Sequence, residues 1–254
     1  MALLAYGTAI SSTIREARAD DIAFVVLAAV PGAVVGGRLI HGLVYLDLYA
    51  TQPAALLDLG RGSLSLVGAV IGGTLTAAYV CRLLGASLRS WADAAAVPLL
   101  LAIGLGKLAM VLGGAGQGQP FDGAWALAFG GGGSWTSAAA ATPAHPSQVY
   151  EALWCVVALP VWIVLGRWLV IRWRGTGLIF LAALAWWLLG RFVVAFTWRD
   201  PPFVAGFGAE QLITLITFVV VVGIGFAAAI SARRRAAEAA ASTPVGPTLT
   251  GTSG

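Results

Sequence analysis

The feature that most constrains this chain is a series of long apolar segments that contain hardly any charged residues. A helix that spans a bilayer needs about 20 consecutive, mostly apolar residues. Charged residues make up only 10% of the 254 residues, whereas soluble domains carry about 25% and need them to cover a water-facing surface. We therefore predict an all-α integral membrane protein with six clear transmembrane helices, near residues 22–46, 64–84, 94–112, 150–171, 177–197 and 208–230.

The two ends of the chain differ from this pattern. Residues 1–14, "MALLAYGTAISSTI", are apolar but too short to span, and they lack the basic region of a secretory signal. We interpret them as a truncated or partly inserted seventh helix. The composition from Ala236 onward is typical of disordered chain. The predicted organisation is a polytopic membrane domain, 1–232, followed by a tail, 233–254, that is basic at first and then disordered.

The basic residues predict the orientation, because Lys and Arg concentrate in short cytoplasmic loops. With the N-terminus outside and the C-terminus in the cytoplasm, the inward loops hold ten of the fifteen basic residues. The net charge of +4 then reflects orientation, and nucleic acid is not an expected partner. The ten residues are Arg15, Arg18, Arg82, Arg89, Arg167, Arg172, Arg174, Arg233, Arg234 and Arg235.

The two cysteines, Cys81 and Cys155, lie in or beside apolar segments. We predict that both are small packing residues. No spacing of metal ligands is found in the sequence, so no metal site is expected.

Ionisable residues at membrane depth are costly and mark candidate sites. Arg38 and His41 are three residues apart and therefore neighbours on a helix. Arg38 either extends to the interface or lines a polar cavity. Lys107 lies within an apolar segment and needs an anion, a carbonyl or water. The glycines that follow it, Gly113, Gly114, Gly116 and Gly118, predict an irregular segment after the helix.

Two arginines follow in residues 186–202. Arg199 stands beside Trp198 and Asp200, a pattern typical of an interface anchor. Arg191 lies in mid-helix with no acid near it in sequence. It must therefore find a partner elsewhere in the fold or bind an anionic ligand.

The densest polar cluster is "HPSQVYE", residues 145–151, at the start of an apolar run. With His145 as N-cap, Gln148 would complete a capping box. Capping uses one or two side chains, however, and Ser147, Gln148 and Glu151 share one helix face. The excess favours a site. Several cations and this helix start together predict a membrane protein that handles an anionic lipid.

The same residues resemble a known family, the prolipoprotein diacylglyceryl transferases. "HPSQVYE" is similar to the HPSQ-Y-E signature of that family. The other similar segments, in the same order along roughly residues 5–225, are "GGRL" (36–39), "SLSLVGAVIGG" (63–73), "GLGKLAMVLGGAGQG" (104–118), "GRFVVAFTWRDP" (190–201) and "AEQL" (209–212).

The resemblance implies a seven-helix enzyme of the bacterial plasma (inner) membrane that uses no metal or organic cofactor. Such an enzyme moves diacylglyceryl from phosphatidylglycerol to the lipobox cysteine thiol of a preprolipoprotein signal peptide, and glycerol phosphate leaves. By the same resemblance Arg191 and Lys107 are the catalytic candidates. The implied lipid- or phosphate-binding residues are Arg38, His145, Ser147, Gln148, Tyr150 and Glu151, with His41, Arg199 and Gln211 as further candidates.

Several motif positions differ in this chain. Lys107 stands for an arginine and keeps the charge without the bidentate fork. A family histidine falls at Val67, and the other replaced positions are Met110, Gly113, Ala115, Trp187 and Ala195. An inactive relative that binds anionic lipid or lipoproteins is therefore the alternative to an active transferase. A transporter is disfavoured because the sequence contains neither paired broken helices nor an acidic relay.

Overall fold

The structure is a computed structural model that describes residues 19–58, 64–128 and 142–241. Within these ranges the chain forms helices, loops and three isolated β-bridges. Five helices are long and apolar enough to cross a membrane, and α6 contains a shorter apolar stretch, Ser147–Val161. The predicted all-α membrane fold is thus confirmed. The helices of this fold, α6 included, are α2 (Ala19–Val44), α4 (Leu66–Leu83), α5 (Leu88–Leu112), α6 (Ser147–Trp173), α7 (Leu178–Val194) and α8 (Ala209–Ala241).

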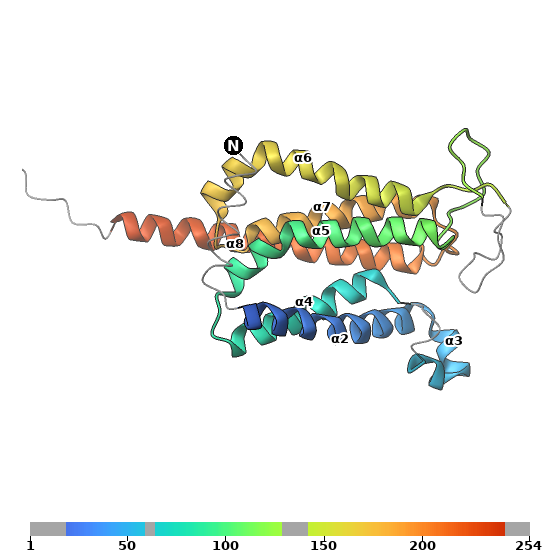
Figure 1. The fold of residues 1–254 in the computed structure, drawn as a ribbon, viewed down its shortest axis with the longest axis horizontal. Coiled ribbons are helices and arrows are strands. Elements are labelled where there is room, and N and C mark those ends of the chain that lie inside the picture. Colours follow the sequence, from blue (N-terminus) through green and yellow to red (C-terminus); the bar gives the residue numbers. More distant parts are fainter. Residues whose placement is uncertain (1–18, 59–63, 129–141, 242–254) are drawn as a thin grey trace, which may run out of the picture.

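The helices form two groups (Figure 1). Helices α5, α6, α7 and α8 make one bundle, and α2 and α4 lie side by side along it. In the apolar window of α7, 56% of the residues are buried, against 11% in that of α8. Helix α7 is therefore the central element of the bundle, and most of α8 remains available to face lipid. Trp187 and Leu188 of α7 pack with Leu100 of α5 in the main apolar cluster.

Helices α2 and α4 pack through glycines. A Cβ on Gly36 of α2 would lie 2.3 Å from the carbonyl oxygen of Gly68 of α4. A Cβ on Gly72 would lie 2.1 Å from the carbonyl oxygen of Gly32. Each helix therefore carries two small residues four positions apart that let the backbones meet, as in other membrane helix pairs.

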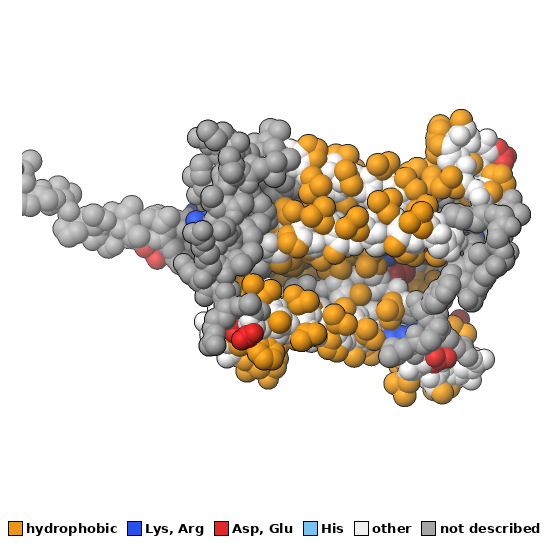
Figure 2. All heavy atoms as spheres, viewed as in Figure 1, with side chains coloured by type: hydrophobic (Ala, Val, Ile, Leu, Met, Phe, Trp, Pro, Cys, Tyr) orange, Lys and Arg blue, Asp and Glu red, His pale blue; other side chains and the backbone are white. Residues whose placement is uncertain are grey.

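A cleft separates much of the α2–α4 pair from the bundle (Figure 2). Apolar side chains cover most of the helix surfaces on both sides of it in this view. At one point the two groups meet, because Val67 of α4 is fully buried in the same apolar cluster as Leu100 and Trp187. Val67, where the resemblance places the family's histidine, is therefore part of the core.

Two helices extend beyond their predicted limits. Helix α5 begins at Leu88 rather than near residue 94, so it includes the buried Asp93. The Asp93 carboxylate accepts hydrogen bonds from the backbone N–H groups of Gly177, Ile179 and Phe180, at 3.1, 3.0 and 3.3 Å. A charged residue that would be costly in lipid is thus stabilised at the start of α7, whose N–H groups need acceptors.

Helix α8 continues to Ala241. The prediction of disorder from Ala236 is therefore wrong for residues 236–241, where alanine and glutamate are strong helix formers. The predictions for residues 1–14, Arg15, Arg18 and the tail after 241 lie outside the described residues.

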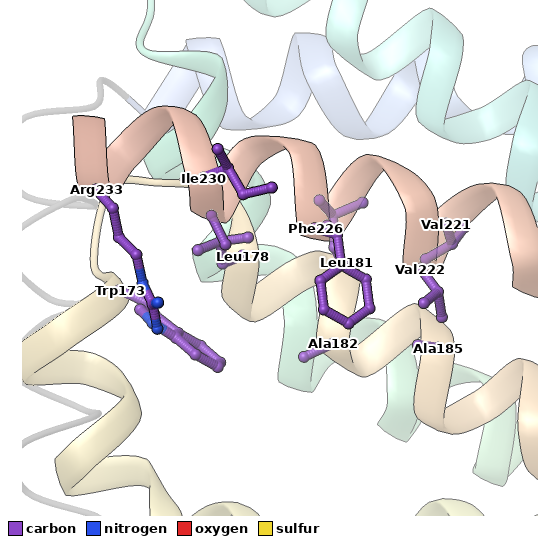
Figure 3. A pocket seen from close by; sticks show the side chains of 12 residues that line it. Trp173, Leu178, Leu181, Ala182, Ala185, Val221, Val222, Phe226, Ile230 and Arg233 are labelled. Atoms are coloured by element: carbon purple, nitrogen blue, oxygen red, sulfur yellow. The ribbon is translucent and has the colours of Figure 1, made fainter. Parts of the chain in front are cut away.

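Helices α7 and α8 also border an apolar groove (Figure 3). Leu181 and Phe226 line it, and Trp173 and Arg233 lie at one end. Arg233 is 23 residues after Glu210 on α8, which corresponds to about 35 Å along a helix. The Arg233 end of the groove is therefore far from Glu210, at the other end of α8.

Candidate active site

The site begins where the loop after α5 meets the start of α6. Helix α5 ends at Leu112, and Gly114 and Gly116 of the following loop have positive φ. This confirms the irregular segment predicted after Lys107. The Gln148 side chain donates from Nε2 to the carbonyl of Gly116 at 3.0 Å. A Cβ on Gly116 would lie 2.1 Å from the same nitrogen, so glycine is required for this approach.

The capping box, the alternative to a site at the start of α6, is not formed by Gln148. The helix begins at Ser147, whose backbone N–H donates to the carbonyl of His145 at 2.8 Å. Gln148 points to the α5–α6 loop instead of reaching back to the helix start. Its side chain therefore joins two segments 32 residues apart in sequence.

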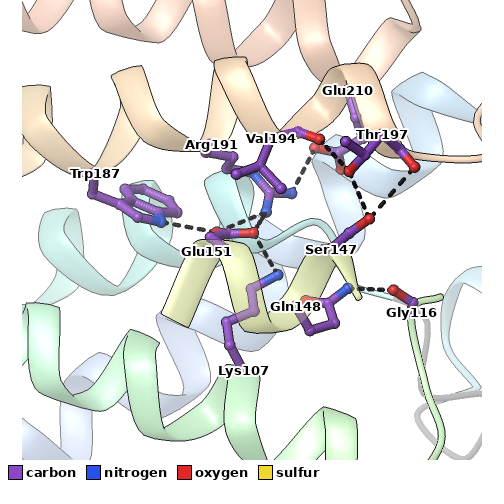
Figure 4. A network of polar contacts seen from close by, with 10 residues as sticks. All are labelled: Lys107, Gly116, Ser147, Gln148, Glu151, Trp187, Arg191, Val194, Thr197 and Glu210. Carbon is purple, nitrogen blue, oxygen red and sulfur yellow. Dashed lines mark hydrogen bonds and ion pairs between the residues drawn. The ribbon is translucent and has the colours of Figure 1, made fainter. Parts of the chain in front are cut away.

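Glu151 is the centre of the site. It is completely buried, and Lys107, Arg191 and Trp187 converge on its carboxylate (Figure 4). Lys107 Nζ lies 2.9 Å from Oε2, and one terminal guanidinium nitrogen of Arg191 lies 3.2 Å from both oxygens. The indole Nε1 of Trp187 donates to Oε1 at 3.1 Å. Three helices of the bundle, α5, α6 and α7, are joined at this one carboxylate.

Arg191 has a second acidic partner. Its other terminal nitrogen lies 3.4 Å from Oε2 of Glu210, the second residue of α8. The guanidinium carbon also lies 4.5 Å from the centre of the Trp198 ring, a cation–π distance. The partner that Arg191 was predicted to need is therefore found 40 residues before it and again 19 residues after it.

The two cations and two carboxylates of this cluster are all buried: Lys107 and Arg191 are each 5% exposed. Burying a charge without a partner costs several kcal/mol. The ion pairs offset that cost and fix the relative positions of α5, α6, α7 and α8. They also hold two positive side chains close together in a membrane interior.

Two polar atoms of the cluster still lack partners. Within the described ranges, Arg191 Nε and Gln148 Oε1 are buried without a hydrogen bond. A buried polar group without a partner costs about 1–3 kcal/mol. The Arg191 N–H can donate to an added anionic group, and the Gln148 carbonyl oxygen can accept from a hydroxyl.

The remaining residues of "HPSQVYE" surround this centre. Ser147 Oγ lies 2.7 Å from Oγ1 of Thr197, which links α6 to the end of α7. The His145 ring stacks on Phe121 at 4.0 Å, and its Nδ1 lies 3.2 Å from the hydroxyl of Tyr150. His145 and Tyr150 thus lie on the side of the site that is formed by the loop between α5 and α6.

The four other predicted residues lie around the same end of the molecule. Arg38 is 5% exposed and donates to the carbonyl of Asp58, so the interpretation as an arginine reaching out to the interface is wrong. His41 Nδ1 lies 2.9 Å from the hydroxyl of Tyr49. Both residues of α2 are held by polar contacts within the short segment that follows it.

Arg199 and Gln211 have structural contacts. Arg199 Nε donates to the carbonyl of Gly118, which joins the loop after α7 to the loop after α5. Gln211 Nε2 donates to the carbonyl of Phe192 at 3.3 Å and joins α8 to α7. Cys81 and Cys155 are free and buried, as predicted for packing residues.

Sequence reasoning missed Glu210 and underrated the tryptophans Trp187 and Trp198. Glu210 had one available signal, because it is an acid at the start of an apolar helix, but such acids also occur as ordinary helix-end residues. Trp187 was noted only as a replaced motif position. Only the fold shows that both tryptophans contact the Glu151–Arg191 pair.

The helical fold and the ion-paired polar centre define a class: multi-pass membrane proteins that carry charged side chains between their spanning helices. The chain belongs to the prolipoprotein diacylglyceryl transferase family, whose model matches residues 1–228. The resemblance predicted from the motifs is confirmed.

Curated relatives support this assignment. A phosphatidylglycerol–prolipoprotein diacylglyceryl transferase of Geobacter sulfurreducens is 32% identical over 222 residues, which cover 85% of this chain and 80% of the relative. The protein of the same name from Brucella anthropi is 32% identical over 228 residues, covering 86% of this chain and 75% of the relative. The chain is therefore a member of a transferase family over most of its length.

Proposed function

We propose that this protein transfers the diacylglyceryl group of phosphatidylglycerol to the thiol of a lipobox cysteine in preprolipoproteins. The observation that carries the proposal is the buried Lys107–Glu151–Arg191 cluster in a chain of this family. We further propose that the site opens toward the outer side of the bacterial plasma membrane and that the C-terminus is cytoplasmic. The basic residues of the inward loops support this orientation.

In this reaction a thiol displaces glycerol phosphate from a glyceryl carbon. Negative charge builds up on the departing phosphate, and preorganised cations lower that barrier. Lys107 and Arg191 are suited to this task, because both side chains are buried and both contact the Glu151 carboxylate. Arg38, His145, Ser147, Gln148, Tyr150 and Glu151 would shape the headgroup pocket, and His41, Arg199 and Gln211 would border it.

Glu151 would position the cations rather than react. Its carboxylate holds Lys107 and Arg191 before substrate arrives, so little reorganisation is needed when phosphate binds. The unpaired Arg191 Nε and Gln148 Oε1 supply additional contacts for a phosphate and a glycerol hydroxyl.

The test is transfer of diacylglyceryl from phosphatidylglycerol vesicles to a lipobox peptide, followed by product mass. Arg191→Ala should abolish the product, and Lys107→Gln should lower kcat/KM by about 100-fold, the usual effect of losing one charge-stabilising group. Lys107→Arg should keep activity because it restores the residue type of the family motif. The control is Arg82→Ala, at an exposed arginine on α4.

Undiminished product in Arg191→Ala contradicts the proposed role of that arginine. A wild-type protein that binds phosphatidylglycerol yet forms no diacylglyceryl-cysteine would be the inactive relative and would overturn the proposal.

A further inference from the structure

The proposed reaction requires that the acceptor thiol lose its proton, because the thiolate is the nucleophile. The family histidine position is occupied here by Val67, which is completely buried in the apolar core. That position can neither accept a proton nor reach a substrate. If the proposed function holds, another group of this chain must take the proton, and the inference below rests on that function.

Few groups of the chain can act as a base near neutral pH. The whole sequence contains two histidines, His41 and His145, and imidazole is the side chain best matched to this task. The His145 ring is stacked on Phe121 in the loop region, with its Nδ1 near Tyr150. Glu151 is occupied by two cations and Glu210 by Arg191. Among the contacts within the described residues, His41 is neither stacked under a loop nor ion-paired.

The surroundings of His41 resemble those of an oriented base. His41 lies one helical turn after Arg38 on α2 and is half-buried. Its Nδ1 lies 2.9 Å from the Tyr49 hydroxyl, and its ring centre lies 4.6 Å from that of Tyr45. These contacts fix the ring and leave Nε2 as the nitrogen for an incoming proton. A base held by a third group is the usual arrangement for activating a nucleophile.

His41 lies within electrostatic range of Glu210 of α8 and of Arg38 on its own helix. Burial raises the pKa of Tyr45, and Asp200 and Glu210 raise it further, which places Tyr45 in range of both carboxylates. Glu210 itself pairs with Arg191. His41 of α2 is thus within electrostatic range of the acid that pairs with Arg191.

We propose that His41 is the general base of this chain and that Tyr49 orients it. The thiol proton passes to His41 Nε2 as the sulfur attacks the glyceryl carbon. The carbon–sulfur bond forms, and the carbon–oxygen bond to phosphate breaks. Glycerol phosphate leaves with the bonding electron pair, beside Lys107 and Arg191. The imidazolium then returns its proton to solvent, so the products are the thioether, glycerol phosphate and one proton.

The experiment compares two acceptor peptides that differ in one atom, a lipobox peptide with cysteine and the same peptide with selenocysteine. A selenol is already ionised at neutral pH and needs no base. His41→Gln should lower kcat with the cysteine peptide by at least 100-fold, within the usual range for general-base catalysis. The same variant should keep most of its rate with the selenocysteine peptide, with an unchanged KM for phosphatidylglycerol.

Tyr49→Phe should show a smaller loss with the same preference for the selenol. Tyr79→Phe, at an exposed tyrosine on α4, is the matched control and should behave as wild type with both peptides. Equal losses with both peptides would mean that His41 only supports the fold and would overturn the proposal. A His41→Gln enzyme as fast as wild type with cysteine would overturn it too, while leaving the proposed transferase function intact. A wild-type protein inactive with both peptides would defeat the function itself and this inference with it.

Discussion

Glu151 is the residue on which the arrangement of the polar centre depends, because both buried cations bind its carboxylate. Removing one partner of a buried ion pair costs more than the pair contributes, since it leaves a charge without compensation. The stability of the bundle and the readiness of the site for phosphate are therefore properties of the same side chain.

Glu151→Gln should destabilise the protein by about 3–5 kcal/mol, the usual cost of breaking a buried ion pair. The amide keeps the volume of the side chain and can still accept a hydrogen bond from Trp187. The loss of stability therefore measures the contribution of the negative charge. Unfolding in detergent micelles, followed by tryptophan fluorescence, measures the change. Glu238→Gln, at an exposed glutamate of α8, is the control. Equal unfolding midpoints for Glu151→Gln and Glu238→Gln would contradict this expectation.

Asp200 should make the stability of the protein depend on pH. Burial raises its pKa above the ordinary value of 3.8, and Glu210 raises it further. A raised carboxyl pKa means that the folded state binds the proton more tightly, so this stabilising contribution is complete below pH 3.8 and is lost as pH rises through the folded-state pKa. Asp200→Asn should therefore melt at a higher temperature than wild type at pH 7, and the difference should shrink toward pH 4. A difference independent of pH would rule this cause out.

At this scale the sequence identified most members of the site but not their pairing. The costly cations Lys107 and Arg191 and the acid Glu151 could be found because charge is rare in apolar segments. Their contacts could not, because Arg191 binds acids 40 and 19 residues away. The capping box for Gln148 failed because a local pattern competed with a distant carbonyl, that of Gly116.

At the scale of elements, the α2–α4 pair is defined by its glycines rather than by large apolar side chains. Contact between the two backbones sets one wall of the cleft and thereby the position of Arg38 and His41. A side chain at Gly36 would meet backbone, which has little freedom to move.

Gly36→Val should separate α2 from α4, because its Cβ would fall 2.3 Å from the carbonyl oxygen of Gly68. We expect a destabilisation of about 1–3 kcal/mol, typical of overpacking, and a loss of transfer activity. Gly223→Ala on α8 is the control, since no atom lies within 4 Å of the added Cβ. Melting in detergent and the transfer assay measure both effects. A Gly36→Val protein as stable as the control would show that the pair tolerates a wider spacing.

The existence of the helices could be predicted from apolar length, whereas their ends could not. Helix α5 starts six residues before the predicted segment because the Asp93 carboxylate is stabilised by hydrogen bonds from the start of α7, which no local pattern reveals. Helix α8 passes the predicted boundary because alanine-rich sequence propagates a helix beyond the apolar span.

At the scale of the whole molecule, Arg89 and Asp122 test the proposed orientation. Arg89 lies in the first turn of α5 and Asp122 in the loop after it, and both are exposed. They therefore lie at opposite ends of one spanning helix. We expect Asp122→Cys to react with a membrane-impermeant maleimide added to spheroplasts, and Arg89→Cys to react only after permeabilisation. Cys81 and Cys155 are buried and should add little background. The reverse pattern would invert the topology.

The balance of charge in the polar centre has a consequence for turnover. Lys107 and Arg191 are matched by Glu151 and Glu210, so the cluster is electrically neutral before substrate arrives. In the proposed reaction a phosphodiester brings one negative charge, and the departing monoester carries about 1.5 to 2. Each cycle thus drives the pocket further from neutrality as the product forms. The two carboxylates that stabilise the empty site would then repel glycerol phosphate, so the enzyme should discharge its product readily and be poorly inhibited by it.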